Sequence, residues 1–324
     1  MSILVTGGAG FVGSHLIERL ARRGGAVGGD GSIVCLDNFN DYYDPALKRK
    51  NVGGFGDLPG VKVIEADFCD QAAMHDLFAR ENVKSVVHLG AYAGVHASVA
   101  SPHVYQRNNV QGTLALLEAA RQHPVSRFLL ISSSTVYGLG AAIPFQEDAP
   151  PGIPASPYGA TKRAAELMGL TYHQLHSVPV VCLRPFSVYG PRLRPDLAMS
   201  IFTQKIIAGQ PLSLYGDGSV RRDFTHVSDI CDGLTAALSA ENVAGQAINL
   251  GHSHPVEIRQ VIAMLESAIG KKAIVKKHPP RAEDLPVTFA DLGKATRLLN
   301  YSPKVTFEEG IPEYVDWYRS WHKV

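Results

Sequence analysis

Short apolar runs rich in β-branched residues recur along the chain, each separated from the next by a segment with helical periodicity. The runs are hydrophobic throughout rather than in alternation, which is typical of strands covered on both faces. Strands that alternate with helices pair in parallel, so we predict an α/β protein with a Rossmann-like, doubly wound parallel sheet. The expected strands are 2–7, 32–37, 61–67, 85–90, 127–133, 180–185 and 246–251.

The residue composition of the sequence changes after the sixth expected strand. Proline, glycine and arginine gather in segments such as "GPRLRPDLA" and "KKHPPRAEDLP", which indicates loops. A chain of 324 residues can hold two domains, since single cores stop growing near about 250–300 residues. Because the last expected strand returns to the sheet, we predict a discontinuous second domain. The predicted limits are 1–183 and 226–252 for the Rossmann domain, and 184–225 and 253–324 for a smaller α/β substrate domain.

The charge balance argues against two classes of partner. With 31 basic and 30 acidic residues the formal net charge is +1, which gives no general attraction to nucleic acid or to an anionic membrane. No apolar run approaches the ~20 residues that span a bilayer, and no basic segment precedes the first strand. We therefore expect a cytoplasmic protein that binds neither nucleic acid nor membrane. Any anion that it binds must be held by local groups.

The cysteines and histidines do not indicate a metal site. Cys35, Cys69, Cys182 and Cys231 are far apart and mostly lie in apolar surroundings, which favours buried free thiols in a reducing compartment. The histidines of "GHSHP" are better explained by a solvated loop than by metal ligation. We expect no bound metal.

A glycine-rich turn follows the first expected strand. In "ILVTGGAGFVGSHLIERL", Gly7, Gly10 and Gly13 lie where the strand gives way to a helix, together with Phe11 and Val12. Glycines at this place permit a tight turn and the close approach of a pyrophosphate, which the N–H groups of the helix N-terminus then bind. The combination of strand, turn and helix predicts a dinucleotide site.

The following strands supply the other expected cofactor contacts. Asp37 and Asn38 end the second strand, and a carboxylate there can accept hydrogen bonds from both ribose hydroxyls while it repels a 2′-phosphate. We therefore predict NAD rather than NADP. Further expected contacts are Asp67 and Phe68, near the adenine, Leu89 and Ala91, at the end of the fourth strand, and Tyr158 and Lys162.

A tyrosine and a lysine four residues apart form the candidate catalytic pair. Tyr158 and Lys162 in "SPYGATK" would share one face of a helix. The unperturbed pKa of a phenol is about 10, but a nearby ammonium and a positive nicotinamide ring both favour phenolate. Tyr158 could then take a hydroxyl proton as hydride leaves the same carbon.

In "ISSSTVYG", at the end of the fifth strand, alternate residues share a face, so we expect Ser133 and Thr135 to point at the substrate and Ser134 to point away.

Together these features resemble the extended short-chain dehydrogenase/reductase family, and within it the nucleotide-sugar 4-epimerases. The resemblance covers essentially the whole chain and rests on the order and spacing of its motifs. They are "TGGAGFVGSHL", "YQRNNVQGT", "SSSTVYG", "YGATK", "RPFSVYGP", "RRDFTHVSDI" and "FADLGKATRLLNYSPKVTFEEGI". The resemblance implies that the Rossmann domain binds NAD, with Asn109 in the cofactor site, and that the smaller domain binds the nucleotide sugar.

The family resemblance also implies a mechanism. Tyr158 deprotonates the sugar 4-hydroxyl, the C4 hydride passes to NAD, the 4-keto sugar turns over, and hydride returns to its other face. Relatives that dehydrate the sugar have an acidic pair just before "VYG", and those that decarboxylate a uronic acid usually have a glutamate. Ser134 and Thr135 offer no carboxyl group, and epimerisation needs none.

The resemblance therefore favours a 4-epimerase over a decarboxylase or a 4,6-dehydratase of the same family. Two other classes of protein fit the sequence less well. A non-enzymatic, cofactor-binding sensor would not need the Tyr158/Lys162 pair, and a serine hydrolase would need a Gly-x-Ser-x-Gly elbow that the sequence lacks.

Two segments, "DNFNDYYDPALKR" and "RPFSVYGPRLRPDLAM", are most similar to epimerases that act on UDP-glucuronic acid. In those enzymes the residues that match Ser187 and Arg194 hold the sugar carboxylate, for which a guanidinium offers two parallel donors. Arg192 is also assigned to substrate binding, although both arginines could be loop residues near phosphate. His96 stands where related epimerases often have arginine. UDP-N-acetylglucosamine and UDP-glucose remain alternative substrates.

The resemblance further assigns the nucleotide and the oligomeric state. Arg222 and Arg281 match arginines that bind the diphosphate, and Tyr215 should flank the uracil. A homodimer is implied, through helices at about 100–121 and 157–176.

Overall fold

The computed structural model describes residues 2–22, 31–280 and 285–324. Over these residues seven parallel strands form one sheet, in the order β10-β6-β5-β4-β1-β2-β3, which confirms the predicted doubly wound sheet. The chain starts at β1, runs outward to β3 and then crosses to β4 on the other side of β1. Ligands of such sheets bind at the carboxyl ends of the strands, next to this switch point. The strands are β1 (Ser2–Thr6), β2 (Ser32–Asp37), β3 (Val61–Glu65), β4 (Val83–His88), β5 (Arg127–Ile131), β6 (Val180–Pro185) and β10 (Ala247–Leu250).

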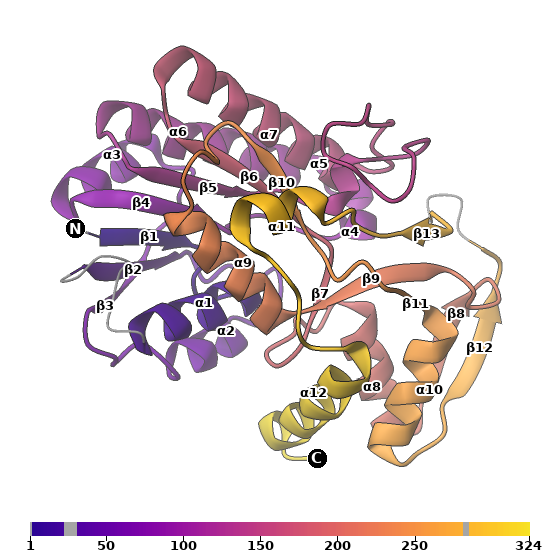
Figure 1. Cartoon of the computed structure of the whole chain (residues 1–324). Coiled ribbons are helices and arrows are strands. Elements are labelled where there is room, and N and C mark those ends of the chain that lie inside the picture. The colour runs from indigo at the N-terminus through magenta and orange to yellow at the C-terminus, as the bar shows by residue number, and fades with distance from the viewer. Residues whose placement is uncertain (1, 23–30, 281–284) are drawn as a thin grey trace.

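Separate sets of helices cover the two faces of the sheet (Figure 1). On one face α3, α6 and α7 cover a core that contains Leu4, and on the other α1 and α9 cover a core that contains Ile3 and Val5. Successive side chains of one strand thus enter different cores, which explains why the strands read as continuous apolar runs. The helices beside this sheet are α1 (Phe11–Arg22), α2 (Pro45–Val52), α3 (Gln71–Arg80), α4 (Val95–Ala100), α5 (Pro102–Tyr105), η1 (Gln106–Gln111), α6 (Gly112–Gln122), η2 (Ser134–Val136), α7 (Pro157–His176), α9 (Val227–Ser239) and α11 (Gly293–Leu299).

The remaining elements form a smaller unit beside the carboxyl edge of the sheet (Figure 1). Within it β9 pairs in parallel with β7 and β13 and antiparallel with β11, while β8 pairs in parallel with β12. The buried side chains of α8, α10 and α12 belong to the same core as those of α1 and α9. The predicted domain limits therefore stay a prediction. These elements are β7 (Ser187–Tyr189), α8 (Ala198–Ala208), β8 (Pro211–Tyr215), β9 (Arg221–His226), β11 (Pro255–Glu257), α10 (Ile258–Ile269), β12 (Ile274–His278), β13 (Val287–Thr288) and α12 (Phe307–His322).

A buried carboxylate joins the smaller unit to the segment that follows β10. Asp223 accepts hydrogen bonds from the backbone N–H groups of His252, Ser253 and Ala290 at 2.8, 3.0 and 3.0 Å. Burial raises the pKa of this carboxyl group, although the three N–H donors act in the opposite direction. One side chain of β9 thus fixes two loops that are far apart in the sequence.

The start of α7 is set by local sequence. Ser156 caps the helix by accepting a hydrogen bond from the N–H of Gly159 at 3.2 Å, and Pro157 occupies the first helical position. Both residue types are preferred at these places. Tyr158 therefore lies in the first turn of α7, and Lys162 follows one turn later.

Two further features concern the cysteines and the helices. All four cysteines are buried and carry free thiols, as predicted. Within the described part of the chain, no helix combines the length and the apolar composition that crossing a membrane would require.

The substitution Gly7→Ala should cost much more stability than an ordinary replacement of a glycine at positive φ. Gly7 has a φ of 65°, and an added Cβ would lie 2.8 Å from the Cα of Gly90, whereas Gly270 has a φ of 74° with no atom within 4 Å of an added Cβ. Gly270→Ala therefore adds conformational strain alone, about 1–2 kcal/mol. We expect Gly7→Ala to lower the free energy of unfolding in urea by roughly 3 kcal/mol or more. Equal losses in the two variants would contradict the close approach of β1 to the segment after β4.

Candidate active site

The turn after β1 is shaped to admit a pyrophosphate. The N–H of Gly10 donates to the carbonyl of Gly7 at 3.1 Å, and an added Cβ on Gly13 would overlap that same carbonyl. Phe11 begins α1, and no acidic residue lies in the first turn of this helix. Its N-terminal N–H groups can therefore face an anion without competition from a carboxylate.

Asp37 ends β2 and closes the glycine turn from the other side. Its carboxylate accepts hydrogen bonds from the N–H of Ala9 at 3.2 Å and of Phe39 at 2.9 Å. The ammonium of buried Lys48, on α2, lies 3.7 Å from the same carboxylate. Burial lowers the pKa of Lys48, and Asp37 offsets part of that shift. The sequence reasoning missed Lys48, because only the packing of α2 brings it to the end of β2.

Of the two residues predicted to contact the adenine, Asp67 is partly exposed and Phe68 is buried. Asp67 pairs with Arg107 at 2.6 Å and accepts a hydrogen bond from the N–H of Cys69 at 2.9 Å. Burial raises the pKa of Asp67, but these partners outweigh it and the net shift is downward. The ring of Phe68 is buried and packs edge-on against His88 at 5.2 Å. The part of Phe68 in adenine binding stays a prediction, as does that of Asn38, which is half-buried at the end of β2.

Asn109 fixes the segment that follows β4, where Leu89 and Ala91 lie half-buried. Its side chain exchanges hydrogen bonds with the backbone N–H and carbonyl of Tyr92 at 2.8 and 2.9 Å. Its amide also donates to Thr161 of α7 at 3.1 Å. Asn109 lies in η1, a π-helical turn, and such turns often occur at functional sites. The segment after β4 is thereby held against the helix that carries Tyr158.

The hydroxyl-rich segment after β5 corrects one prediction. β5 ends at Ile131, and Ser134–Val136 forms the 3-10 turn η2, so the expected strand geometry of this segment is wrong. Ser133 and Thr135 nevertheless meet, because Ser133 caps the turn. Its Oγ accepts hydrogen bonds from the N–H of Thr135 at 3.2 Å and from the Thr135 hydroxyl at 3.0 Å. Competition between side chain and strand hydrogen bonds explains the difference.

Tyr158 faces Ser133 and Arg194. Burial raises the pKa of the Tyr158 phenol, while a hydrogen bond with Ser133 and the positive charge of Arg194 both lower it. The ring also packs edge-on against Tyr105, with centroids 6.2 Å apart. The net shift of the Tyr158 pKa is upward, so the hydroxyl partner and the cation offset only part of the effect of burial. The positive charge of bound NAD would have to favour the phenolate further.

Lys162 lies one turn further along α7 and is buried. Burial lowers the pKa of its ammonium from 10.5 to about 8, and the carboxylate of Glu166 offsets part of that effect. Glu166 is itself paired with Arg184 and accepts a hydrogen bond from Ser132 at 2.7 Å. Sequence reasoning missed Glu166, although its spacing of four residues from Lys162 was a visible signal.

The arginines that follow β7 point in different directions. Arg194 pairs with Asp196 at 2.7 Å and lies near Tyr158, whereas Arg192 pairs with Glu18 of α1 at 2.6 Å. The contact of Arg192 does not support its predicted substrate role, which stays a prediction. Ser187 begins β7 and is half-buried.

The residues predicted to hold the nucleotide lie in the smaller unit. The ring of Tyr215 stacks on His278 with centroids 5.1 Å apart, and Arg222 donates to the carbonyl of Leu285 at 2.7 Å. Arg281 lies outside the described residues. His96 lies on α4 and is exposed. The roles of these residues stay predictions.

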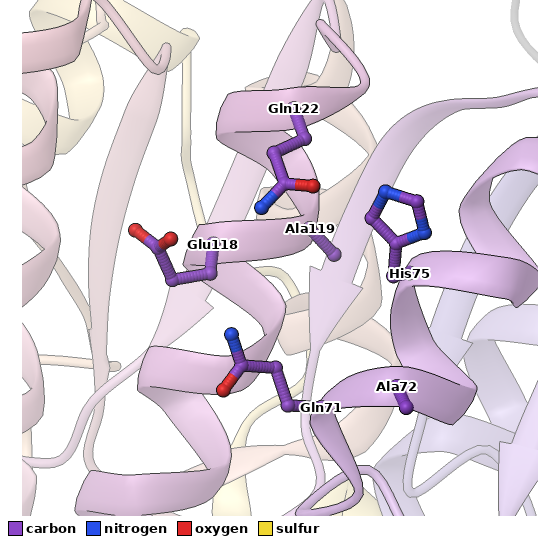
Figure 2. Close-up of a pocket in the computed structure, with 6 residues that line it drawn as sticks. All are labelled: Gln71, Ala72, His75, Glu118, Ala119 and Gln122. Atoms are coloured by element: carbon purple, nitrogen blue, oxygen red, sulfur yellow. The ribbon is translucent and has the colours of Figure 1, made fainter.

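A hollow of about 330 Å³ lies away from the carboxyl edge of the sheet, between α3 and α6. Figure 2 shows Gln71, Ala72 and His75 on α3 beside Glu118, Ala119 and Gln122 on α6, with the Glu118 carboxylate pointing away from His75. The Glu118 carboxylate is already bonded by Arg121 at 2.9 Å and by the Tyr172 hydroxyl at 2.5 Å. A smaller hollow of about 120 Å³ lies beside Arg194. The chemistry described above gathers at the strand ends, so we place the site there and not between α3 and α6.

A dinucleotide turn on a parallel sheet, with a Tyr/Lys pair on the helix after β5, defines a site of the short-chain dehydrogenase/reductase class. Residues 3–251 match the NAD dependent epimerase/dehydratase family. The chain is 39% identical to the UDP-glucuronate 4-epimerase of Thermodesulfobacterium geofontis, over 97% of this chain and 95% of that protein. It is 38% identical to UDP-glucuronate 4-epimerase 4 of Arabidopsis thaliana, over 99% of this chain and 76% of that protein.

A solved structure shows the same similarity in three dimensions. The crystal structure of UDP-glucuronic acid 4-epimerase from Bacillus cereus, in complex with UDP-glucuronic acid and NAD, superposes with a TM-score of 0.92 at 35% identity, covering 99% of this chain and 100% of that one. The chain therefore belongs to the NAD-dependent epimerase/dehydratase family. Its cofactor is NAD, which the glycine turn and Asp37 fit.

The burial of Lys162 predicts a pH-dependent cost to stability. Below about pH 8 the lysine is protonated in both the folded and the unfolded state, and the folded state bears the full cost of the buried charge. Between about 8 and 10.5 the unfolded state binds more protons, so this group makes the free energy of unfolding rise with pH. Lys162→Met should therefore be more stable than the wild type at pH 7, and its advantage should shrink as the pH rises through this range.

Urea unfolding of nucleotide-free protein at a series of pH values measures this advantage. The matched control is Lys277→Met, at an exposed position on β12, for which we expect no such trend. A difference between wild type and Lys162→Met that does not change with pH would contradict the buried ammonium.

Proposed function

We propose that this chain is a UDP-glucuronate 4-epimerase, which interconverts UDP-glucuronic acid and UDP-galacturonic acid. The observation that carries the proposal is the place of Arg194, which follows β7 and lies over the ring of Tyr42, in the segment after β2. From there its charge lowers the pKa of the Tyr158 phenol. An arginine at the catalytic tyrosine suits a sugar that carries a carboxylate, because a guanidinium offers it paired donors. The identity to named UDP-glucuronate 4-epimerases over nearly the whole chain supports the same substrate.

In the proposed mechanism Tyr158 takes the proton of the sugar 4-hydroxyl. Ser133 and Thr135 hold the 4-oxygen by hydrogen bonds, and Arg194 and Ser187 hold the carboxylate. When bound, NAD would supply the acceptor for the C4 hydride and, once reduced, the donor for its return. Between the two transfers the 4-keto ring must turn, so that hydride meets its other face. Lys162 keeps a positive charge in the buried site behind Tyr158, and Glu166 supports that charge.

The carboxylate creates a hazard that the site has to manage. A sugar oxidised at C4 beside a C5 carboxylate is a β-keto acid, which loses carbon dioxide when the breaking bond aligns with the ketone. A carboxylate held by Arg194 can be kept out of that alignment. Ser134 and Thr135 supply no carboxyl group as an acid or base, which supports epimerisation over dehydration.

The smaller unit would bind the uridine diphosphate. We assign the uracil to Tyr215, in its stack with His278, and the diphosphate to Arg222 and Arg281. Two arginines at a diphosphate would supply the local positive charge that a nearly neutral protein needs.

Turnover of three sugars tests the proposed substrate. We expect the purified protein to convert UDP-glucuronic acid with its carboxylate retained, and to act on UDP-glucose and UDP-N-acetylglucosamine much more slowly, as followed by NMR. Tyr158→Phe should lose at least about 100-fold in kcat, the usual contribution of a general base, while it keeps bound NAD.

The matched control is Tyr172→Phe, on the same helix, where the hydroxyl bonds Glu118 away from the site. Release of carbon dioxide as the main reaction would point to a decarboxylase. Fast turnover of a neutral sugar alone would point to UDP-glucose or UDP-N-acetylglucosamine epimerisation. Full activity of Tyr158→Phe would remove the tyrosine as the base.

We also propose a homodimer through the helices of residues 100–121 and 157–176. Exposed apolar side chains on these helices or next to them support it, since Leu167 and Leu175 are 57% and 68% exposed on α7 and Val99 is 65% exposed on α4. Burying such side chains against a second copy removes them from water.

Leu167→Lys should then shift the protein from dimer to monomer at micromolar concentrations, as measured by size-exclusion chromatography with light scattering. Ile274→Lys on β12 is the matched control, because its side chain is 54% exposed outside the proposed interface. A monomeric wild type, or a dimer unaffected by Leu167→Lys, would contradict the proposed interface.

A further inference from the structure

The guanidinium of Arg194 is already bound along one edge by a carboxylate of its own chain. Its Nε donates to Oδ1 of Asp196 at 2.9 Å, and its Nη2 donates to Oδ2 at 2.7 Å. This is the bidentate geometry in which arginine binds carboxylates most strongly. A guanidinium has five N–H donors, so three of them remain for a ligand. A sugar carboxylate must therefore share Arg194 with Asp196.

Tyr42 also contacts both members of the Arg194–Asp196 pair. The guanidinium lies over the ring of Tyr42, 5.4 Å from its centroid, and the Tyr42 hydroxyl lies 3.3 Å from Oδ2 of Asp196. The same hydroxyl donates to the carbonyl of Ala93, in the segment after β4. Arg194 and Asp196 are thus fixed against the segments that follow β2 and β4.

The segment that carries the pair is also pinned to α1. Arg192, with a φ of 64°, bonds Glu18 at 2.6 Å, and the His15 ring nitrogen lies 2.8 Å from the carbonyl of Pro191. Anchors directly before Arg194 limit how far its backbone can move. Arg194 is therefore expected to stay in place while a ligand moves past it.

A fixed arginine presents a difficulty for the proposed reaction. The ring must turn between the two hydride transfers, so the sugar carboxylate has to leave the arginine that held it. Removing one partner of a partly buried cation leaves a charge that water compensates only in part, which costs free energy. The side chain of Arg194 is only 19% exposed, so water replaces a lost partner poorly.

We propose that Asp196 is a positioning residue that keeps Arg194 paired while the sugar carboxylate leaves it, so that the 4-keto ring can turn. The inference rests on the proposed function. Asp196 shares Arg194 with the substrate when the sugar is in place, and it remains as the only bidentate partner that the described structure gives Arg194 when the sugar turns. It weakens the hold on the substrate and lowers the barrier to its release.

Asp196→Asn separates this role from a merely structural one. An asparagine keeps the shape but loses the charge and one of the two acceptors, so the sugar carboxylate meets less competition for Arg194. We expect kcat for UDP-glucuronic acid to fall at least about tenfold without a rise in KM. Enzyme-bound NADH, followed by its absorbance, should accumulate during turnover, because oxidation proceeds while turning is slowed. Asp196→Glu, which keeps the charge, should accumulate less NADH than Asp196→Asn.

The control is Asp232→Asn, which removes a carboxylate paired with Arg19 away from the site and should leave kcat, KM and NADH unchanged. A raised KM with unchanged kcat and no NADH would show that Asp196 only orients Arg194, and would overturn the proposal. Unchanged kinetics in Asp196→Asn would overturn it as well. The wild type is assayed first, and its failure to convert UDP-glucuronic acid would refute the proposed function instead of the role of Asp196.

Discussion

The close approach of two backbone segments at the switch point of the sheet is the constraint on which the site depends. β1 and β4 are neighbours, and the chain leaves them toward opposite halves of the sheet. Gly7 and Gly90 come together there with no room for a Cβ. The cofactor turn begins at Gly7, and the segment that contains Ala91 and Ala93 begins at Gly90, so this contact places the two segments side by side. Asn109 and Tyr42 then tie that second segment to α7 and to Arg194.

Charge in the site is arranged almost entirely in pairs. Asp37 lies by Lys48, Glu166 by Arg184, and Arg194 by Asp196. Buried charges without partners are costly, so the counter-ion of each of these groups offsets part of the cost of burial. Lys162 is buried like Lys48, and burial lowers the pKa of its ammonium to about 8 although the charge of Glu166 opposes that shift. Such a strained group is typical of a functional site.

Much of the fold was predictable from local pattern. Apolar runs between helical segments predicted all seven strands of the large sheet. Six of the strands are mostly buried, which requires that composition, whereas the edge strand β3 is only partly covered and contains Lys62 and Glu65. The glycine turn could be found because strand, turn and helix are contiguous in the sequence. The 3-10 turn after Ile131 was missed, since the choice between strand and turn there depends on how Ser133 bonds its neighbours.

Contacts between distant segments could not be read from the sequence. The pairs Lys48–Asp37 and Arg192–Glu18 join residues whose proximity depends on how α1 and α2 pack. Asp196 is only two residues from Arg194, yet nothing in the sequence indicated that it would occupy the edge expected for substrate. The domain limits, the cytoplasmic location and the roles of the individual site residues stay predictions.

The central claim is that one chain oxidises and re-reduces C4 of UDP-glucuronic acid without losing its carboxylate. UDP-glucuronic acid labelled with deuterium at C4 tests it most directly, with the product followed by NMR and mass spectrometry. We expect UDP-galacturonic acid that retains both the carboxylate and the deuterium at C4, because in the proposed mechanism hydride returns to the carbon it left. Loss of carbon dioxide, or exchange of the label with solvent, would contradict it.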